Sequence, residues 1–192
     1  MQMNDIRHPR PPFGGADEWT VRVEFSKEEI SGSMLQCQNY RTISLISHPS
    51  KVMRKIMLNR LKPQAEMIIA EEQAGFRAGR STTEQIFNLR ILCEKYLQRP
   101  QDLYHVFMDF KKAFNSVWHA ALWTIMKKYN ISTNLIRVSK SLYDKATSAV
   151  PFNSTIADWF RTTAGVREGC LLSSTLFNIF LERIMTDALE DH

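Results

Sequence analysis

Runs of apolar residues separated by polar, glycine-bearing stretches divide this chain into predicted strands and helices. Residues 19–25 (WTVRVEF) alternate apolar and polar side chains, which is typical of a half-buried strand. Residues 103–108 (LYHVFM) form a β-branched and aromatic run, so they predict a buried strand with Asp109 at its end. Residues 149–153 and 159–163 are expected to pair as a hairpin.

Apolar residues at helical spacing predict the helices. The first runs from Ser50 and is expected to end or kink at Pro63. A capping box at residues 81–84 (STTE) starts the second, and residues 118–129 and 133–143 are the next two. The expected apolar faces are Val52, Met53, Ile56, Met57 and Leu61 in the first helix, Ile86, Leu89, Cys93 and Tyr96 in the second, and Leu176, Phe177, Phe180, Ile184 and Leu189 in a last helix.

Length and composition narrow the class of protein. With 192 residues and 44% hydrophobic content, the chain forms one globular domain or part of one. Cys37, Cys93 and Cys170 lie far apart without metal-ligand spacing, which argues against a zinc site or a disulfide scaffold and for a reducing, intracellular compartment. No apolar run is long enough to span a bilayer, and the polar start is no signal peptide. The net charge of +5 suits a polyanionic partner only weakly.

Three stretches carry candidate chemistry. Asp109 follows a predicted buried strand, where an acid faces a metal, a cation or solvent, or hydrogen-bonds a turn. Residues 75–81 (GFRAGRS) bring two arginines to a helix N-terminus, which is either an anion site or an ordinary turn. Residues 165–173 (GVREGCLLS) contain glycines that permit close approach of another backbone.

The order and spacing of these stretches give a stronger signal than any one of them. Together with residues 39–45 (NYRTISL), 71–77 (EEQAGFR) and 175–178 (TLFN), they resemble the reverse transcriptase domain of non-LTR (LINE-like) retrotransposons. The resemblance implies RNA-directed DNA synthesis with Mg²⁺, an RNA template, a DNA primer and dNTPs. It also implies an α+β right-hand fold: fingers at about residues 35–100 and a partial palm, with an incomplete sheet, at about 101–192. Residues 1–34 are expected to be a divergent, partly disordered lead-in.

The resemblance also implies roles for single residues. Asp109 matches the first metal-binding, catalytic Asp, with the backbone carbonyl of Phe110 beside it. Phe114 matches the bulky residue under the incoming sugar that excludes a 2′-hydroxyl, although a core Phe is the alternative. The other expected contacts are Arg77, Glu168 and Gly169 to the nucleotide, and Arg41 and Arg80 to the template.

The chain departs from the family pattern in ways that predict incomplete catalysis. No Ala-Asp-Asp motif occurs before His192, so the second set of metal ligands is missing from this sequence. Glu168 replaces a usual Gln, Ser174 a Pro, and Asn115 an Asp. We therefore expect a truncated, catalytically incomplete fragment whose unpaired palm edge aggregates or borrows a strand. Two alternatives remain: a non-catalytic nucleic-acid-binding or interaction protein using the basic fingers surface, or a piece of a longer product with the hairpin further on.

Overall fold

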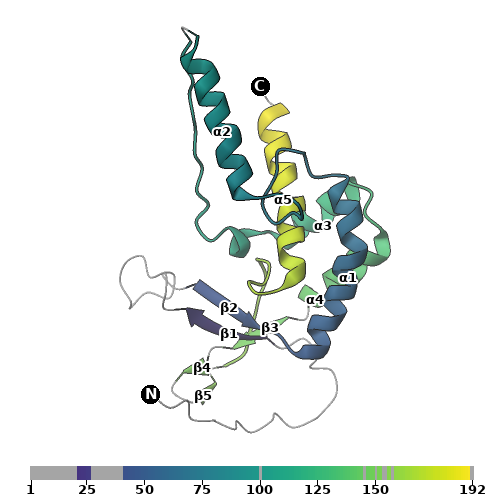
Figure 1. Ribbon diagram of the computed structural model, residues 1–192. Helices are drawn as coiled ribbons and strands as arrows, with labels where there is room; N and C mark the ends of the chain where they lie inside the picture. The colour runs from purple at the N-terminus through teal and green to yellow at the C-terminus, as the bar shows by residue number, and fades with distance from the viewer. Residues whose placement is uncertain are drawn as a thin grey trace.

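A computed structural model describes residues 21–26, 41–99, 101–144, 146–149, 151–152, 155–156 and 158–190. It is mostly helical, with a small sheet at one end (Figure 1). The elements are β1 (Val21–Ser26), β2 (Arg41–Leu45), α1 (His48–Glu66), α2 (Thr82–Leu97), the 3₁₀ helix η2 (Ala113–Ser116), α3 (His119–Lys128), α4 (Thr133–Asp144), β3 (Thr147–Ala149), β4 (Pro151–Phe152), β5 (Thr155–Ile156), β6 (Phe160–Arg161) and α5 (Leu171–Glu190). Most of the expected lead-in at residues 1–34 lies outside the described residues.

The sheet has the strand order β2-β1-β3-β6. Strand β1 runs antiparallel to β2, with Val23 opposite Ser44, and parallel to β3. The predicted strand near residues 19–25 is therefore present over its described part. The predicted hairpin is wrong in its pairing, because β4 pairs with β5 and β3 pairs with β6. Only two residues separate β4 from β5, and closing so short a loop costs little chain entropy.

The core lies where α1, α3, α4 and α5 pack together, and α1 and α5 run beside one another (Figure 1). Its fully buried side chains include Leu61 of α1, Leu122 and Met126 of α3, Leu142 of α4, and Leu172, Leu176 and Ile179 of α5. Helices α3 and α4 confirm the two helices predicted from spacing to within a residue or so. Among the described residues, no helix is both long and apolar enough to cross a membrane.

Helix α1 does not end at Pro63, and its buried face differs from the predicted one. It continues past Pro63 to Glu66, because Leu61 and Ala65 on either side of the proline are buried in the core and hold the last turn in place. The predicted apolar face is also partly wrong. Val52 and Ile56 are 62% and 50% exposed, whereas the polar Arg54 is buried. The burial of Leu61 and Ala65 at the C-terminal end of α1 determines which face of the helix is turned toward the core.

Residues 101–110 correct the prediction of a buried strand. They form no regular secondary structure, and Tyr104, Val106 and Phe107 are 85%, 85% and 82% exposed. A strand needs a neighbour to take up its backbone hydrogen bonds, and in the described part of the chain no strand pairs with this segment. It runs back along α2 instead, where His105 Nε2 lies 3.6 Å from Cys93 Sγ (Figure 1).

Helix α2 begins as the capping box predicts. The Ser81 hydroxyl accepts a hydrogen bond of 3.2 Å from the Glu84 N–H, which satisfies one of the free amides of the first turn. None of its residues is buried, and the helix projects from the body of the molecule (Figure 1). Its predicted apolar face is half-buried at Leu89, Cys93 and Tyr96 and exposed at Ile86.

Candidate functional site

A cavity of about 550 Å³ opens where η2, the 67–80 loop and the start of α5 meet. Three of the residues predicted to contact the nucleotide, Phe114, Glu168 and Gly169, line it together. The remaining lining residues are Phe76, Arg167, Cys170, Leu171, Ser173 and Ser174. Folding thus brings positions 76, 114 and 167–174, which are far apart in the chain, to one place.

Aromatic rings fix Phe114 at the cavity. Its ring stacks on Phe177 of α5, with centroids 4.9 Å apart and planes 20° apart. Phe76 meets the same ring edge-on, at 5.7 Å and 86°. These neighbours were not predicted as site residues, because an exposed loop Phe and a helical Phe carry no signal of their own in sequence. The Phe114 ring is consequently held in one orientation, with only part of its surface exposed.

Phe76 adopts an unusual backbone conformation. Its φ of 58° lies in the left-handed region, which is sparsely populated by bulky residues, and its side chain is 65% exposed. Such a conformation persists only where surrounding contacts over-determine it. Those contacts come from the residues on either side of Phe76 in the loop.

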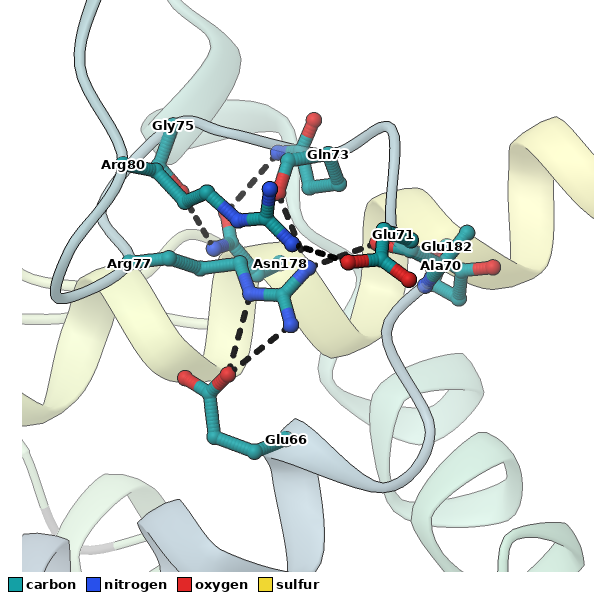
Figure 2. Close-up of polar contacts among 9 residues, drawn as sticks. All are labelled: Glu66, Ala70, Glu71, Gln73, Gly75, Arg77, Arg80, Asn178 and Glu182. Atoms are coloured by element: carbon teal, nitrogen blue, oxygen red, sulfur yellow. Dashed lines mark hydrogen bonds and ion pairs between the residues drawn. The ribbon is translucent and has the colours of Figure 1, made fainter.

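Arg77 supplies the first set of loop contacts (Figure 2). Its Nε and Nη2 atoms donate to Oε2 of Glu66, at 3.0 and 2.9 Å. Nη1 donates to the carbonyls of Ala70 and Gln73, at 2.6 and 3.0 Å. The side chain is 10% exposed, so the structure places this predicted nucleotide contact inside the loop, bonded to α1 and to the loop itself.

Helix α5 supplies the second set (Figure 2). Asn178, which is 2% exposed, donates through Nδ2 to the carbonyl of Gly75 at 2.7 Å and accepts at Oδ1 from Gln73 Nε2 at 3.4 Å. Glu182 accepts a 3.0 Å hydrogen bond from the N–H of Ala70. We did not predict Asn178 from sequence, although a lone amide within an apolar helical stripe could have indicated it. The loop that carries Phe76 is thus fastened to both α1 and α5.

The two arginines predicted to contact the template lie elsewhere. Arg80 forms an ion pair of 2.6 Å with the exposed Glu71, and this hydrogen bond raises the pKa of Arg80 above its usual value. Arg41 begins β2, opposite Ser26 in register, and its side chain is outside the described part of the structure. Arg80 does not line the Phe114 cavity.

The close backbone approach expected from the 165–173 glycines is confirmed at Gly165. Its φ is 88°, and a Cβ there would lie 2.9 Å from the Cα of Asn115. The N–H groups of Gly165 and Val166 donate to the carbonyls of Val117 and Phe114, at 2.8 and 2.7 Å. This contact ties η2 to the 165–170 segment and so sets the position of Phe114 relative to Glu168.

Arg167 places a guanidinium between α4 and the cavity. Nη2 donates to the carbonyl of Leu142 at 3.1 Å, and the guanidinium carbon lies 5.5 Å from the centroid of the Tyr143 ring. Burial, together with the nearby Arg54, lowers the pKa of Arg167 to about 10. Arg167 is therefore still a cation at neutral pH, and it was not among the predicted site residues.

Asp109 is exposed on the 101–110 segment, five residues before Phe114, and does not line the cavity. The backbone carbonyl of Phe110 follows it directly. Within the described ranges, no group of three or more His, Cys, Asp or Glu residues is arranged to hold a metal ion. The predicted ligands, one carboxylate and one adjacent carbonyl, would by themselves be an incomplete set for a divalent cation.

Comparisons with known proteins give the family. The family model described as "Reverse transcriptase (RNA-dependent DNA polymerase)" matches residues 26–192. The chain is 30% identical over 144 residues to the probable RNA-directed DNA polymerase from transposon X-element of Drosophila melanogaster, covering 74% of this chain and 16% of that protein. It is 28% identical over 148 residues to the RNA-directed DNA polymerase from mobile element jockey of Drosophila funebris, covering 76% of this chain and 16% of that protein.

A third relative is the transposon TX1 uncharacterized 149 kDa protein of Xenopus laevis, 27% identical over 151 residues, covering 79% of this chain and 12% of that protein. The chain thus spans between 12% and 16% of the length of these three relatives. A solved partial Cas6-RT-Cas1–Cas2 complex has a chain with a TM-score of 0.46 at 19% identity, covering 88% of this chain and 26% of that one, a likeness too low to support an argument. The chain belongs to the reverse transcriptase family, among relatives of the non-LTR retrotransposon type.

Proposed function

We propose that this chain is part of an RNA-directed DNA polymerase domain in which the cavity beside Phe114 receives the incoming dNTP. The observation that carries the proposal is the convergence of Phe114, Glu168 and Gly169 on one cavity of about 550 Å³. An RNA template and a DNA primer are the implied partners, and the fingers and palm are assigned to about residues 35–100 and 101–192. The family match favours this proposal over a non-catalytic nucleic-acid-binding protein.

The cavity residues have distinct proposed roles. The Phe114 ring, held flat by Phe177, forms the surface on which the sugar lies, so a 2′-hydroxyl would collide with it. Arg167 attracts the phosphates, whereas the carboxylate of Glu168 repels them. Arg77 acts through the loop that carries Phe76, since its guanidinium is bonded within that loop. Arg41 and Arg80 are the proposed template contacts.

The metal is the incomplete part of the site. Reverse transcriptases use divalent cations, and Mg²⁺ prefers carboxylate oxygens, so Asp109 and the Phe110 carbonyl are its proposed ligands. Among the described residues, no group of three or more His, Cys, Asp or Glu side chains is arranged around them to hold a metal ion. Two-metal phosphoryl transfer needs both ions held in fixed positions. We therefore propose that residues 1–192 need further carboxylates to catalyse polymerisation.

Nucleotide binding tests the cavity without requiring catalysis. Residues 1–192 should bind a fluorescent dATP analogue saturably, and Phe114→Val should reduce the preference for dATP over ATP because the smaller side chain leaves room for a 2′-hydroxyl. Leu92→Val, on the remote face of α2, is the control. If the protein binds no dATP, or if a folded Phe114→Val protein discriminates as wild type does, the proposed site is wrong.

Primer extension tests the metal site separately. Purified residues 1–192, given an RNA template, a DNA primer, dNTPs and Mg²⁺, should incorporate no nucleotide. Incorporation that Asp109→Ala abolishes would show that other residues of this chain complete the ligand set, and would refute the proposed incompleteness.

The exposed 101–110 segment also has a proposed role. Its apolar side chains and free backbone groups provide an edge to which another strand can add, so self-association or strand-borrowing is expected there.

A further inference from the structure

A second hollow, of about 470 Å³, lies between α3, α4 and β6 and shares no lining residue with the Phe114 cavity. No predicted site residue lies in it. The residues that line it include Trp118, His119, Trp123, Lys127, Lys140 and Arg161. We call this hollow the α3–α4 groove.

Three rings in tilted or edge-to-face contact make the floor of the α3–α4 groove rigid. The ring of His119 lies 6.1 Å from that of Trp123 and 5.0 Å from that of Tyr143, and the last two are 5.8 Å apart. His119 Nε2 is 2.7 Å from the carbonyl of Gly165, which fixes the imidazole. Trp123 and Tyr143 are buried, so this floor is preformed and does not have to be ordered by a ligand.

The rim of the groove is cationic. Lys127 and Lys140 are exposed, and in the described part of the chain neither takes part in an ion pair or a side-chain hydrogen bond. Arg161 donates to the main-chain carbonyl of Asp144 at 2.6 Å, which orients the guanidinium without neutralising its charge. Asp144 supplies the one carboxylate among the described lining residues, so three cations face one acid.

An exposed indole stands at one end of the groove. Trp118 is 64% exposed, while its backbone is held by a bridge to Ala164. His119, Trp123 and Lys127 follow at intervals of four residues and so form one stripe along α3. The nine-residue rise from Trp118 to Lys127 corresponds to about 14 Å of helix. The groove is therefore elongated, with a stacking surface at one end and positive charge along it.

We propose that the α3–α4 groove binds a segment of single-stranded nucleic acid, with phosphates against Lys127, Lys140 and Arg161 and a base on Trp118. Proteins hold single strands with cationic side chains that contact the phosphates and aromatic side chains that stack on the bases. A duplex keeps its base faces stacked and offers none to the indole. An acidic peptide would meet the cations but would gain nothing from the ring. This surface is separate from the proposed dNTP cavity and does not depend on it.

Fluorescence anisotropy with a labelled single-stranded oligouridylate of about 12 nucleotides, a typical site length, tests the proposal on the intact chain. Lys127→Glu/Lys140→Glu should raise Kd about tenfold or more at low salt. Losing two phosphate contacts should also reduce the slope of log K against log salt by roughly 1.4. Trp118→Ala should raise Kd roughly fivefold to a hundredfold with the slope unchanged, because stacking releases no counterions.

The matched control is Lys55→Glu/Lys128→Glu, which makes the same charge change at exposed lysines outside the groove. Equal loss in this control would mean that binding follows net charge and would overturn the proposal. The proposal would also be overturned if the groove variants, including the milder Lys127→Gln/Lys140→Gln, bound the oligonucleotide with the wild-type Kd. Competition distinguishes the possible ligands, and unlabelled oligouridylate should displace the probe. If poly-glutamate or free UTP displaced the probe as effectively, the groove would not be specific for a nucleic-acid strand. Thermal melting verifies that each variant is folded.

Discussion

At the scale of single residues, two arginines show how burial changes the contribution of an ion pair to the stability of the fold. Arg77 is 10% exposed and bonds both Glu66 and two main-chain carbonyls. Arg90 pairs with Glu94 one helical turn away, but its side chain is 75% exposed. Exposed helical pairs contribute at most a few tenths of a kcal/mol, whereas a buried multidentate guanidinium cannot be replaced by an ammonium.

Arg77→Lys should therefore lower the free energy of unfolding by about 1–3 kcal/mol, because a lysine leaves main-chain carbonyls of the loop unsatisfied. Arg90→Lys, the matched control, should change it by less than about 0.5 kcal/mol. Urea denaturation followed by circular dichroism measures both. Equal effects would show that the 67–80 loop is not held as described.

Glu168 carries a prediction about the nucleotide. Glu168→Gln should tighten dATP binding several-fold, because it removes the repulsion between the carboxylate and the phosphates. Two like unit charges about 4 Å apart in water repel each other by about 1 kcal/mol. Titration with fluorescent dATP at two salt concentrations measures this, and the gain should shrink at higher salt. Glu72→Gln, on the exposed loop, is the control and should have no effect. Unchanged or weaker binding by Glu168→Gln would place the phosphates away from this carboxylate.

At the scale of elements, α2 and α5 are helices of similar length with opposite environments. Helix α2 has 16 residues and none of them is buried. Helix α5 has 20 residues, and Leu172, Leu176 and Ile179 are fully buried. An isolated helix of the length of α2 is only marginally stable in water, so its persistence depends on its cap and local contacts.

We expect amide hydrogens of α2 to exchange much faster than those of α5, because opening α2 breaks no core packing. Ser81→Ala should speed exchange in α2 further, through a loss of about 1 kcal/mol of capping, while leaving α5 unchanged. Hydrogen exchange read by mass spectrometry resolves the two helices. Protection of α2 equal to that of α5 would mean that something covers its exposed face.

At the scale of the whole molecule, α2 and the 101–110 segment form a projecting arm (Figure 1), and many of the apolar side chains on this arm are exposed. Exposed side chains there include Ile86, Phe87, Leu92, Tyr104, Val106, Phe107 and Met108. Exposed apolar side chains of this kind favour association where they form a patch.

Sedimentation velocity should accordingly show concentration-dependent self-association of residues 1–192. Val106→Lys/Phe107→Lys should reduce it, because charge on this exposed apolar segment opposes its pairing with another chain. Val52→Lys/Ile56→Lys adds the same charge to exposed apolar positions of α1 and should have little effect. A wild-type protein that stays monomeric at all concentrations would contradict the prediction.

The sequence by itself determined the features that depend on local chemistry. Helices α3 and α4 follow from apolar spacing alone, and Ser81 caps α2 because a hydroxyl three residues before a backbone N–H can reach it in any context. The glycine-bearing motifs likewise indicated the family and the close approach at Gly165, since only a residue without a Cβ fits there.

Only the tertiary structure decided which faces are buried and which segments meet. Arg54 is buried and Val52 exposed because core packing, not hydropathy, orients α1. The 103–108 run is not a strand, because a strand depends on a partner and none pairs with it within the described residues. The links from Asn178 to Gln73 and Gly75 join positions more than one hundred residues apart, and spacing carries no information about such contacts. They exist because the packing of α5 beside the 67–80 loop leaves buried polar groups that must be satisfied.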